Sequence, residues 1–156
     1  MKEIVAVLCD VRSIHNVGSI FRTADAAGIS KIYLCGITPM PLDRFGKVRP
    51  EFAKVALNAE QSVQWEYKKS AAGVLTGLTK QGYAVVAIEQ AKGSKAYPSL
   101  RKKSGKFALV VGNEVAGLSK PILKKADIVI EIPMRGEKES LNVSVAFGIV
   151  AYGIQY

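Results

Sequence analysis

Short apolar runs alternate with segments of helical periodicity along most of this chain. The runs are rich in β-branched residues and predict strands over residues 4–11, 31–37, 83–90, 107–112 and 127–133. Between them, apolar residues recur three and four positions apart, which predicts helices over residues 17–27, 50–61, 71–81, 119–126 and 141–153. Near-continuous apolar strands separated by helices favour a parallel sheet covered on both faces. The pattern therefore predicts an α/β fold.

Length and composition are those of a protein that can bury a core of its own. With 156 residues, 49% of them hydrophobic, we expect residues 1–156 to form a single domain without extension domains. The apolar N-terminal run is too short for a signal peptide, and no apolar run approaches the roughly 20 residues of a membrane span. Cys9 and Cys35 lie in apolar runs away from any cysteine or histidine cluster, as reduced core residues do. We therefore expect a cytoplasmic protein that makes no membrane contact.

Charge changes the picture by pointing to a polyanionic partner. The 22 Lys and Arg residues outnumber 13 acidic residues, which gives a net charge of +9. Nucleic acid is favoured over a membrane, because no basic amphipathic helix with bulky apolar anchors stands out. Two segments predicted as loops, 38–49 and 91–105, are either solvated surface or phosphate contacts, and their excess of one sign favours contacts. The basic residues are Arg44, Lys47 and Arg49 in the first segment, and Lys92, Lys95, Arg101, Lys102 and Lys103 in the second, which also contains Tyr97.

Several familiar chemistries are absent from the sequence. His15 is the only histidine and no partner cluster accompanies it, so a histidine triad and a metal site are both disfavoured. No G-x-x-x-x-G-K-[ST] loop occurs, and no G-x-G-x-x-G follows a predicted strand. The sheet must therefore bind its ligand through another arrangement.

Polar groups follow three predicted strands, at the edge where open α/β sheets place their ligands. Asn16 lies at a helix entry, where it either caps the helix or faces a ligand, and Arg22 interrupts the apolar set farther along, so it needs a partner if it is covered. Glu114 follows the strand that ends near Gly112. Ser140 and Asn142 lie where the last helix begins, and capping alone would explain both.

Taken in order, these segments resemble the three motifs of the SpoU/TrmH family of RNA ribose 2′-O-methyltransferases, within the SPOUT superfamily. The resemblance covers essentially the whole chain, and the ordered set with its spacing is highly specific. The matching residues are Asn16…Gly18…Arg22-Thr23-Ala24, then Val111-Gly112-Asn113-Glu114…Gly117, and then Ile132-Pro133-Met134…Gly136…Ser140-Leu141-Asn142-Val143.

The family resemblance implies a more specific fold than periodicity does. It implies a Rossmann-like parallel sheet with helices on both faces, whose C-terminal part threads through a loop as a deep trefoil knot, an arrangement that ordinary topology makes rare. It also implies a homodimer. A dimer would give the apolar helix near residues 143–154 a partner surface, whereas the simpler alternative is a helix buried within one monomer.

The resemblance also implies the cofactor, which is S-adenosylmethionine bent within the knot, and the residues around it. Arg22 is placed at the reacting ribose hydroxyl, where the family proposes a base; because a guanidinium has a pKa above about 12, electrostatic positioning is the physically safer role. Glu114 would pair with Arg22 or with the ammonium of the cofactor. The implied catalytic residues are Asn16, Arg22, Glu114, Ser140 and Asn142; the implied cofactor contacts are Ile88, Glu89, Gly112, Ile132, Met134, Ser140 and Leu141; and the expected RNA contacts are Arg12, Arg22, Arg44, Lys47 and Arg49.

The RNA itself is less specified by the sequence. Residues 58–61 and 65–66 are similar to members that act on tRNA and on rRNA alike, and we expect tRNA because small stand-alone members often use it. Two alternatives stay open: a non-catalytic RNA-binding protein with this fold, and a SPOUT methyltransferase that acts on a base nitrogen. The complete polar set argues against the first, and the combination of Arg22 with Ser140-Leu141-Asn142 fits the ribose branch better than the second.

Overall fold

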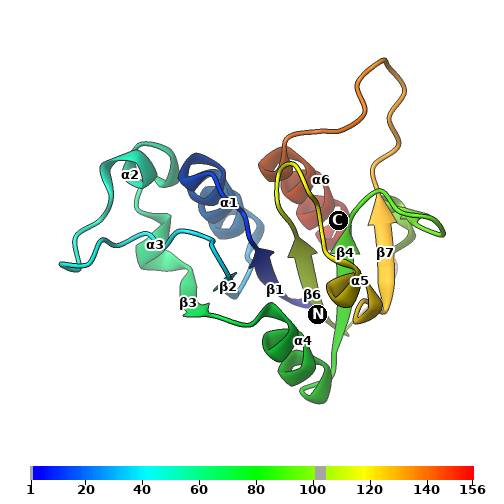
Figure 1. Cartoon of the computed structure of the whole chain (residues 1–156), viewed down its shortest axis with the longest axis horizontal. Helices are drawn as coiled ribbons and strands as arrows, with labels where there is room; N and C mark the ends of the chain where they lie inside the picture. The colour runs from blue at the N-terminus through cyan, green and yellow to red at the C-terminus, as the bar shows by residue number, and fades with distance from the viewer. Residues whose placement is uncertain (1, 101–104) are drawn as a thin grey trace.

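A single parallel sheet organises the part of the chain that the structure describes. This structure is a computed structural model and describes residues 2–100 and 105–156. Within them, seven strands lie in the order β3-β2-β1-β6-β4-β7-β5, and every strand pairing is parallel (Figure 1). The strands are β1 (Lys2–Cys9), β2 (Lys31–Cys35), β3 (Gln64–Lys68), β4 (Tyr83–Ile88), β5 (Lys95–Ala96), β6 (Gly105–Val111) and β7 (Ile128–Glu131).

Helices cover both faces of this sheet, which confirms the predicted α/β class. Successive side chains of a strand point to opposite faces, so β1 sends Leu8 into one hydrophobic cluster and Val7 into the other. Phe21, Phe52 and Phe147 from three helices pack in the first cluster, while the second holds residues of two further helices. The helices are α1 (Ile14–Ala27), α2 (Pro50–Ala56), α3 (Ala59–Ser62), α4 (Ala71–Lys80), α5 (Lys120–Lys124) and α6 (Val143–Gln155), with a 3-10 turn η1 (Tyr97–Leu100).

The predicted strands begin and end elsewhere than expected, and the difference creates the site. The run predicted over 83–90 ends as a strand at Ile88, and the run predicted over 127–133 ends at Glu131. The residues beyond these strand ends turn away from the sheet and become loops. Cys9 and Cys35 are buried and unbridged neighbours on β1 and β2, as expected for core residues.

Two predictions in the N-terminal half were wrong. The helix predicted over 50–61 breaks after Ala56, because Leu57 and Asn58 adopt left-handed conformations at φ 50° and 68°. The break ends α2 and lets α3 start in a new direction. Strand β3 was not predicted at all: it is an edge strand whose residues are mostly polar, so it lacks the continuous apolar run of a buried strand.

The segment predicted as a second long loop, 91–105, is also more ordered than expected. It contains β5 at the sheet edge and η1, whose Leu100 is buried and whose Tyr97 packs against the core beside α6. The expected contacts Arg101, Lys102 and Lys103 lie outside the described residues. Helix α6 returns across the sheet to pack against α1 and η1. The threaded knot stays a prediction.

Candidate active site

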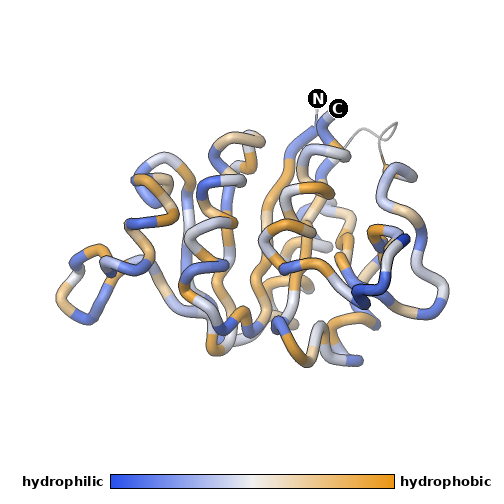
Figure 2. The backbone as a smooth tube through the Cα atoms, turned by 90° about the horizontal axis from the view of Figure 1, so that it is seen from above, coloured by the Kyte–Doolittle hydropathy of each residue, from blue (hydrophilic) through white to orange (hydrophobic). Residues whose placement is uncertain are grey.

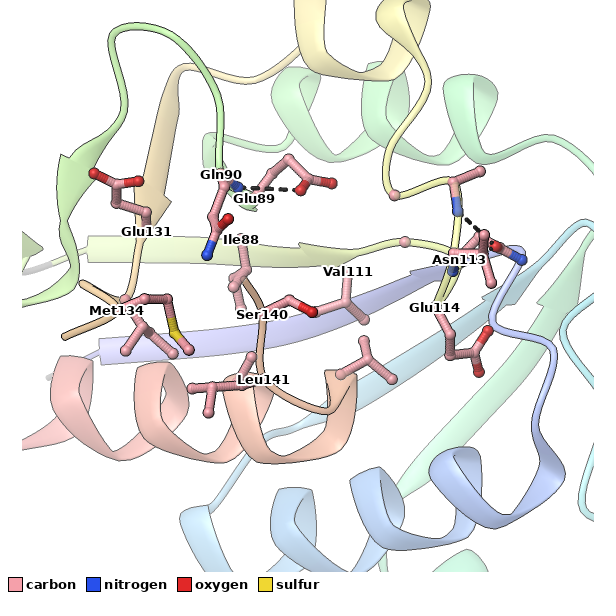
Figure 3. Close-up of a pocket in the computed structure, with 17 residues that line it drawn as sticks. Ile88, Glu89, Gln90, Val111, Asn113, Glu114, Glu131, Met134, Ser140 and Leu141 are labelled. Atoms are coloured by element: carbon pink, nitrogen blue, oxygen red, sulfur yellow. Dashed lines mark hydrogen bonds between the residues drawn. The ribbon is translucent and has the colours of Figure 1, made fainter. Parts of the chain in front are cut away.

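A cavity of about 230 Å³ opens at the carboxyl ends of β4, β6 and β7 (Figure 3). Three loops meet there, one after each strand, and the first turn of α6 completes the wall. The seven residues expected to contact the cofactor all line this cavity: Ile88, Glu89, Gly112, Ile132, Met134, Ser140 and Leu141. Met134, Ser140 and Leu141 lie across from Ile88 and Gln90 (Figure 3). The structure therefore brings together positions that lie far apart in the sequence.

Sequence reasoning missed several residues of the cavity wall. Gln90 and Glu131 add an amide and a carboxylate, and Val115 and Ala116 add apolar surface. None of them sits at a diagnostic spacing: Glu131 is the last residue of β7, and the other three lie in the loops after β4 and β6. The available signal was their place near the carboxyl ends of predicted strands: Gln90 and Glu131 lie within the runs predicted over 83–90 and 127–133, and Val115 and Ala116 follow the run predicted over 107–112.

The loop after β6 is held in a tight turn. Asn113 Oδ1 accepts hydrogen bonds from the backbone N–H groups of Val115 and Ala116, each at 2.9 Å, and the N–H of Gly117 donates to Asn113 O at 2.9 Å. A Cβ on Gly112 would lie 2.6 Å from the carbonyl carbon of Gly117, so only glycine permits this approach. The turn fixes the backbone that forms one wall of the cavity.

Glu89 joins this turn to the neighbouring strand. One carboxylate oxygen accepts from the N–H of Leu118 at 2.9 Å, and the other accepts from the N–H of Gln90 at 3.1 Å. Gly117 has φ +68°, and a Cβ there would lie 2.4 Å from Glu89 Oε2. Glu89 thus acts on the cavity by holding two of its walls together.

Glu114 binds the start of α1. Its carboxylate accepts from the backbone N–H groups of Arg12 and Ser13, both at 3.0 Å, and from Asn16 Nδ2 at 3.1 Å. Burial alone would raise the pKa of Glu114, but these hydrogen bonds outweigh it and leave the pKa lowered. Glu114 is therefore a carboxylate at a helix N-terminus, where negative charge is favoured. Of the two partners predicted for Glu114, Arg22 is not among the groups it binds in the described chain.

Asn16 does not cap α1, which was one of the two roles considered for it. Ser13 caps α1, its hydroxyl accepting from the N–H of Asn16 at 3.2 Å. The side chain of Asn16 is thereby free to bridge: it donates to Glu114, and its Oδ1 accepts from Asn142 Nδ2 at 3.1 Å. Asn142 does cap α6, as expected, because its Oδ1 accepts from the N–H of Ser144 at 2.9 Å. The three polar strand ends form one hydrogen-bonded chain.

The expected RNA contacts are dispersed. Arg22 is exposed on α1, so the condition under which it would need a partner is not met, and it is not among the described residues that line the cavity. Arg12 is exposed beside the start of α1. The loop between β2 and α2 carries Arg44, Lys47 and Arg49 at the far end of the sheet (Figure 1). The five residues thus come from two parts of the chain, the segment from just before α1 to its middle and the loop that leads into α2.

Residues 2–100 and 105–156 contain no group of three or more His, Cys, Asp or Glu side chains that could hold a metal ion. No helix in the described chain is long and apolar enough to cross a bilayer.

Known proteins resemble the chain in both sequence and fold. It is 32% identical over 154 residues to the 23S rRNA (guanosine-2′-O-)-methyltransferase RlmB of Coxiella burnetii. The matched region covers 97% of this chain and 58% of that relative. The AdoMet-bound rRNA methyltransferase of Sinorhizobium meliloti superposes with a TM-score of 0.86 at 30% identity, covering 98% of this chain and 56% of that chain. A structure concerned with 2-OH methylation of C/U34 on tRNA superposes with a TM-score of 0.80 at 28% identity and is covered over 93% of its own chain.

These similarities extend over nearly all of the fold and site described above. The chain spans somewhat more than half the length of the curated relatives that it matches, with 57% and 58% of two RlmB proteins covered. Residues 3–152 match the SpoU rRNA Methylase family, and this range includes the cavity and all three polar strand ends. The chain therefore belongs to the SpoU rRNA methylase family.

Proposed function

We propose that this chain transfers a methyl group from S-adenosylmethionine to a ribose 2′-hydroxyl of RNA. The observation that carries the proposal is the single cavity that collects all seven residues expected to contact the cofactor. Family membership supports the reaction class, and the net charge of +9 suits an RNA partner.

The residues of the cavity fit the proposed cofactor. Ile88, Met134 and Leu141 offer apolar surface to an adenine ring, while Ser140 and the backbone beside Gly112 offer hydrogen bonds. Glu89 and Glu131 supply carboxylate charge at the same wall, which suits a cationic ligand. S-adenosylmethionine, when bound, supplies an activated sulfonium methyl group. The protein must then align the acceptor hydroxyl and exclude water, and alignment alone can supply much of the rate.

The hydrogen-bonded chain of Glu114, Asn16 and Asn142 is proposed to position the acceptor side of the site. It fixes the starts of α1 and α6 relative to the cavity, so that Ser140 faces the ligand from a defined backbone. Arg22 is proposed to hold the phosphate or the developing alkoxide of the acceptor nucleotide by charge. Because Arg22 lies outside the cavity of its own chain, we propose that it acts at the site of a second subunit.

A homodimer is therefore part of the proposal. Helix α6 buries Phe147, Val150 and Ile154 in its own chain but leaves Val145 49%, Tyr152 42% and Tyr156 74% exposed on another face. The rings of Tyr152 and Tyr156 stack with centroids 6.0 Å apart. An apolar helix face of this kind suits a second copy, as the family resemblance implies. Sedimentation should give a dimer that Tyr152→Lys shifts toward monomer; a monomeric wild type would contradict the dimer.

We propose tRNA as the RNA class. The supporting observation is the similarity to the chain concerned with tRNA 2-OH methylation, which this chain covers almost completely. Ribosomal RNA is the second candidate, favoured by the names of the RlmB relatives. The test is transfer of labelled methyl from S-adenosylmethionine to unmodified tRNA and rRNA in separate reactions. Label in tRNA alone supports the proposal, label in rRNA alone replaces tRNA by rRNA, and RNA binding without label in either favours the non-catalytic alternative.

A further inference from the structure

The loop between β2 and α2 presents an aromatic side chain to solvent at its tip. Phe45 is 73% exposed, although phenylalanine is among the residues most often buried. The loop protrudes at one end of the molecule, at the left of Figures 1 and 2, and hydrophilic residues surround the tip. An exposed ring at a protruding tip calls for an explanation other than core packing.

Hydrogen bonds hold the backbone of the tip that carries this ring. Asp43 Oδ1 accepts from the backbone N–H groups of Phe45 at 2.8 Å and Lys47 at 3.0 Å, and the N–H of Asp43 donates to Lys47 O at 2.8 Å. Below the tip, Leu42 and Val48 form an antiparallel bridge. The backbone of Phe45 is therefore fixed before any partner arrives, which lowers the ordering cost of a contact.

Positive charge accompanies the ring. The guanidinium carbon of Arg44 lies 4.8 Å from the centroid of Phe45, within the range of a cation–π contact. Lys47 is exposed two residues on, and Arg49 follows. The nearest carboxylate, Asp43, is occupied by the backbone bonds described above. A rigid aromatic ring, a planar cation and a flanking ammonium together match what single-stranded nucleic acid offers, since bases stack on the first two and phosphates bind the third.

We propose that the tip formed by Arg44, Phe45 and Lys47 binds an unpaired base of the substrate RNA by stacking. The identity of the partner as RNA rests on the proposed function. A single ring flanked by the cations of Arg44 and Lys47 fits a base better than a protein partner, which would require a wider apolar surface.

The position of the tip predicts that its contact affects RNA binding and not the methyl-transfer step. In the chain it lies at the opposite end of the sheet from β7 and the cofactor cavity (Figure 1). The proposed contact holds a base other than the reacting nucleotide, so it stabilises bound substrate and transition state equally and changes KM rather than kcat.

The experiment measures binding of two fluorescent RNA probes without cofactor: a stem-loop with an unpaired loop, and a fully paired duplex of equal length. Phe45→Ala should weaken stem-loop binding by roughly 10-fold or more, as loss of one stacked base does, and leave duplex binding unchanged. Phe45→Trp should bind the stem-loop as wild type does. Leu57→Ala, which removes another exposed apolar side chain, is the control and should have no effect.

Kinetics then separate this inference from the proposed function. If the chain methylates RNA, Phe45→Ala should raise KM for RNA and leave kcat and cofactor affinity unchanged. Equal stem-loop affinities for wild type and Phe45→Ala would overturn the stacking contact while leaving the methyl-transfer proposal intact. Equal losses on stem-loop and duplex would overturn it too, since they indicate a contact that does not need an unpaired base. Weakened stem-loop binding in a protein that transfers no methyl would support the contact and reject the proposed reaction.

Discussion

Asn142 donates a hydrogen bond to Asn16 across 3.1 Å, although 126 positions separate the two residues in the sequence. Asn16 passes the connection on to Glu114, whose carboxylate binds the start of α1. One asparagine side chain therefore joins the N-terminal ends of α1 and α6 to the loop after β6. The loop after β6 and the start of α6 line the cofactor cavity, and the start of α1 is bonded to both. A change at Asn16 should therefore reach the cavity without touching the cofactor.

Replacing Asn16 tests this connection. Asn16→Ala removes both side-chain bonds, and we expect methyl transfer to fall on the order of 100-fold, as misplaced reacting groups do. Thermal stability should fall only slightly, since an exposed hydrogen bond contributes about 1 kcal/mol or less. Single-turnover rates and thermal melts measure the two effects. Gln64→Ala, which removes an exposed amide on the edge strand β3, is the control; a wild-type rate for Asn16→Ala would refute the positioning role.

Gly112 allows the turn after β6 to pack closely, and this turn forms one wall of the cavity. In Gly112→Ala the new Cβ would lie 2.6 Å from Gly117 C and 2.8 Å from Leu118 N, so the turn must open. We expect the free energy of unfolding to fall by about 1–3 kcal/mol and cofactor binding, measured by calorimetry, to weaken.

The matched control for Gly112→Ala is Gly77→Ala in α4. A Cβ at Gly77 meets nothing within 4 Å, so alanine there should raise stability by up to about 1 kcal/mol through helix propensity. Cofactor affinity should not change in this variant. Equal affinities for both variants and wild type would show that the turn does not shape the site.

Glu114 predicts a pH dependence. Its pKa is lowered in the folded protein, so its bonds stabilise the fold above the usual pKa of about 4.5 and are lost as pH falls through the lowered value. Glu114→Gln cannot make the charged bonds at any pH. The stability difference between wild type and Glu114→Gln should be present near pH 7 and shrink as the pH falls below the ordinary pKa of about 4.5, as followed by thermal unfolding. A difference that is constant with pH would contradict the assignment.

Arg22 should be required for transfer and not for cofactor binding. Arg22→Ala is expected to abolish methyl transfer with nearly unchanged cofactor affinity, because Arg22 lies outside the cavity of its own chain. Mixed dimers of Arg22→Ala and Gly112→Ala subunits should regain activity if Arg22 serves the neighbouring site, since one of the two sites then has both parts intact. No recovery from mixing would place Arg22 at the site of its own subunit.

The sequence predicted the central strands well because both faces of the sheet are covered. Val7 and Leu8 are both fully buried on opposite faces, so a continuous apolar run marks β1. Strand β3 was not predicted because it lies at the edge of the sheet and consists of exposed and half-buried residues, most of them polar. The helix break at Leu57 was not predicted because leucine seldom adopts a left-handed conformation, and no turn residue precedes it.

The family motifs identified the residues that line the cavity in the folded chain. The spacing of apolar and polar residues identified little else of the site. Ser13 and Asn16 are both good capping residues three positions apart, so sequence alone could not choose between them. The choice depends on Glu114, which reaches α1 from nearly a hundred residues away. Gln90 lies in the loop after β4 and Glu131 ends β7. Both line the cavity because these two strands pair and end side by side, which periodicity does not encode.

The measurement that tests the central claim most directly is the chemical position of the transferred methyl group. RNA methylated by this protein with labelled S-adenosylmethionine would be digested to nucleosides and separated by chromatography. We predict label only in a 2′-O-methylnucleoside, and none with Arg22→Ala. Label on a base would contradict the claim and assign the chain to base-nitrogen chemistry.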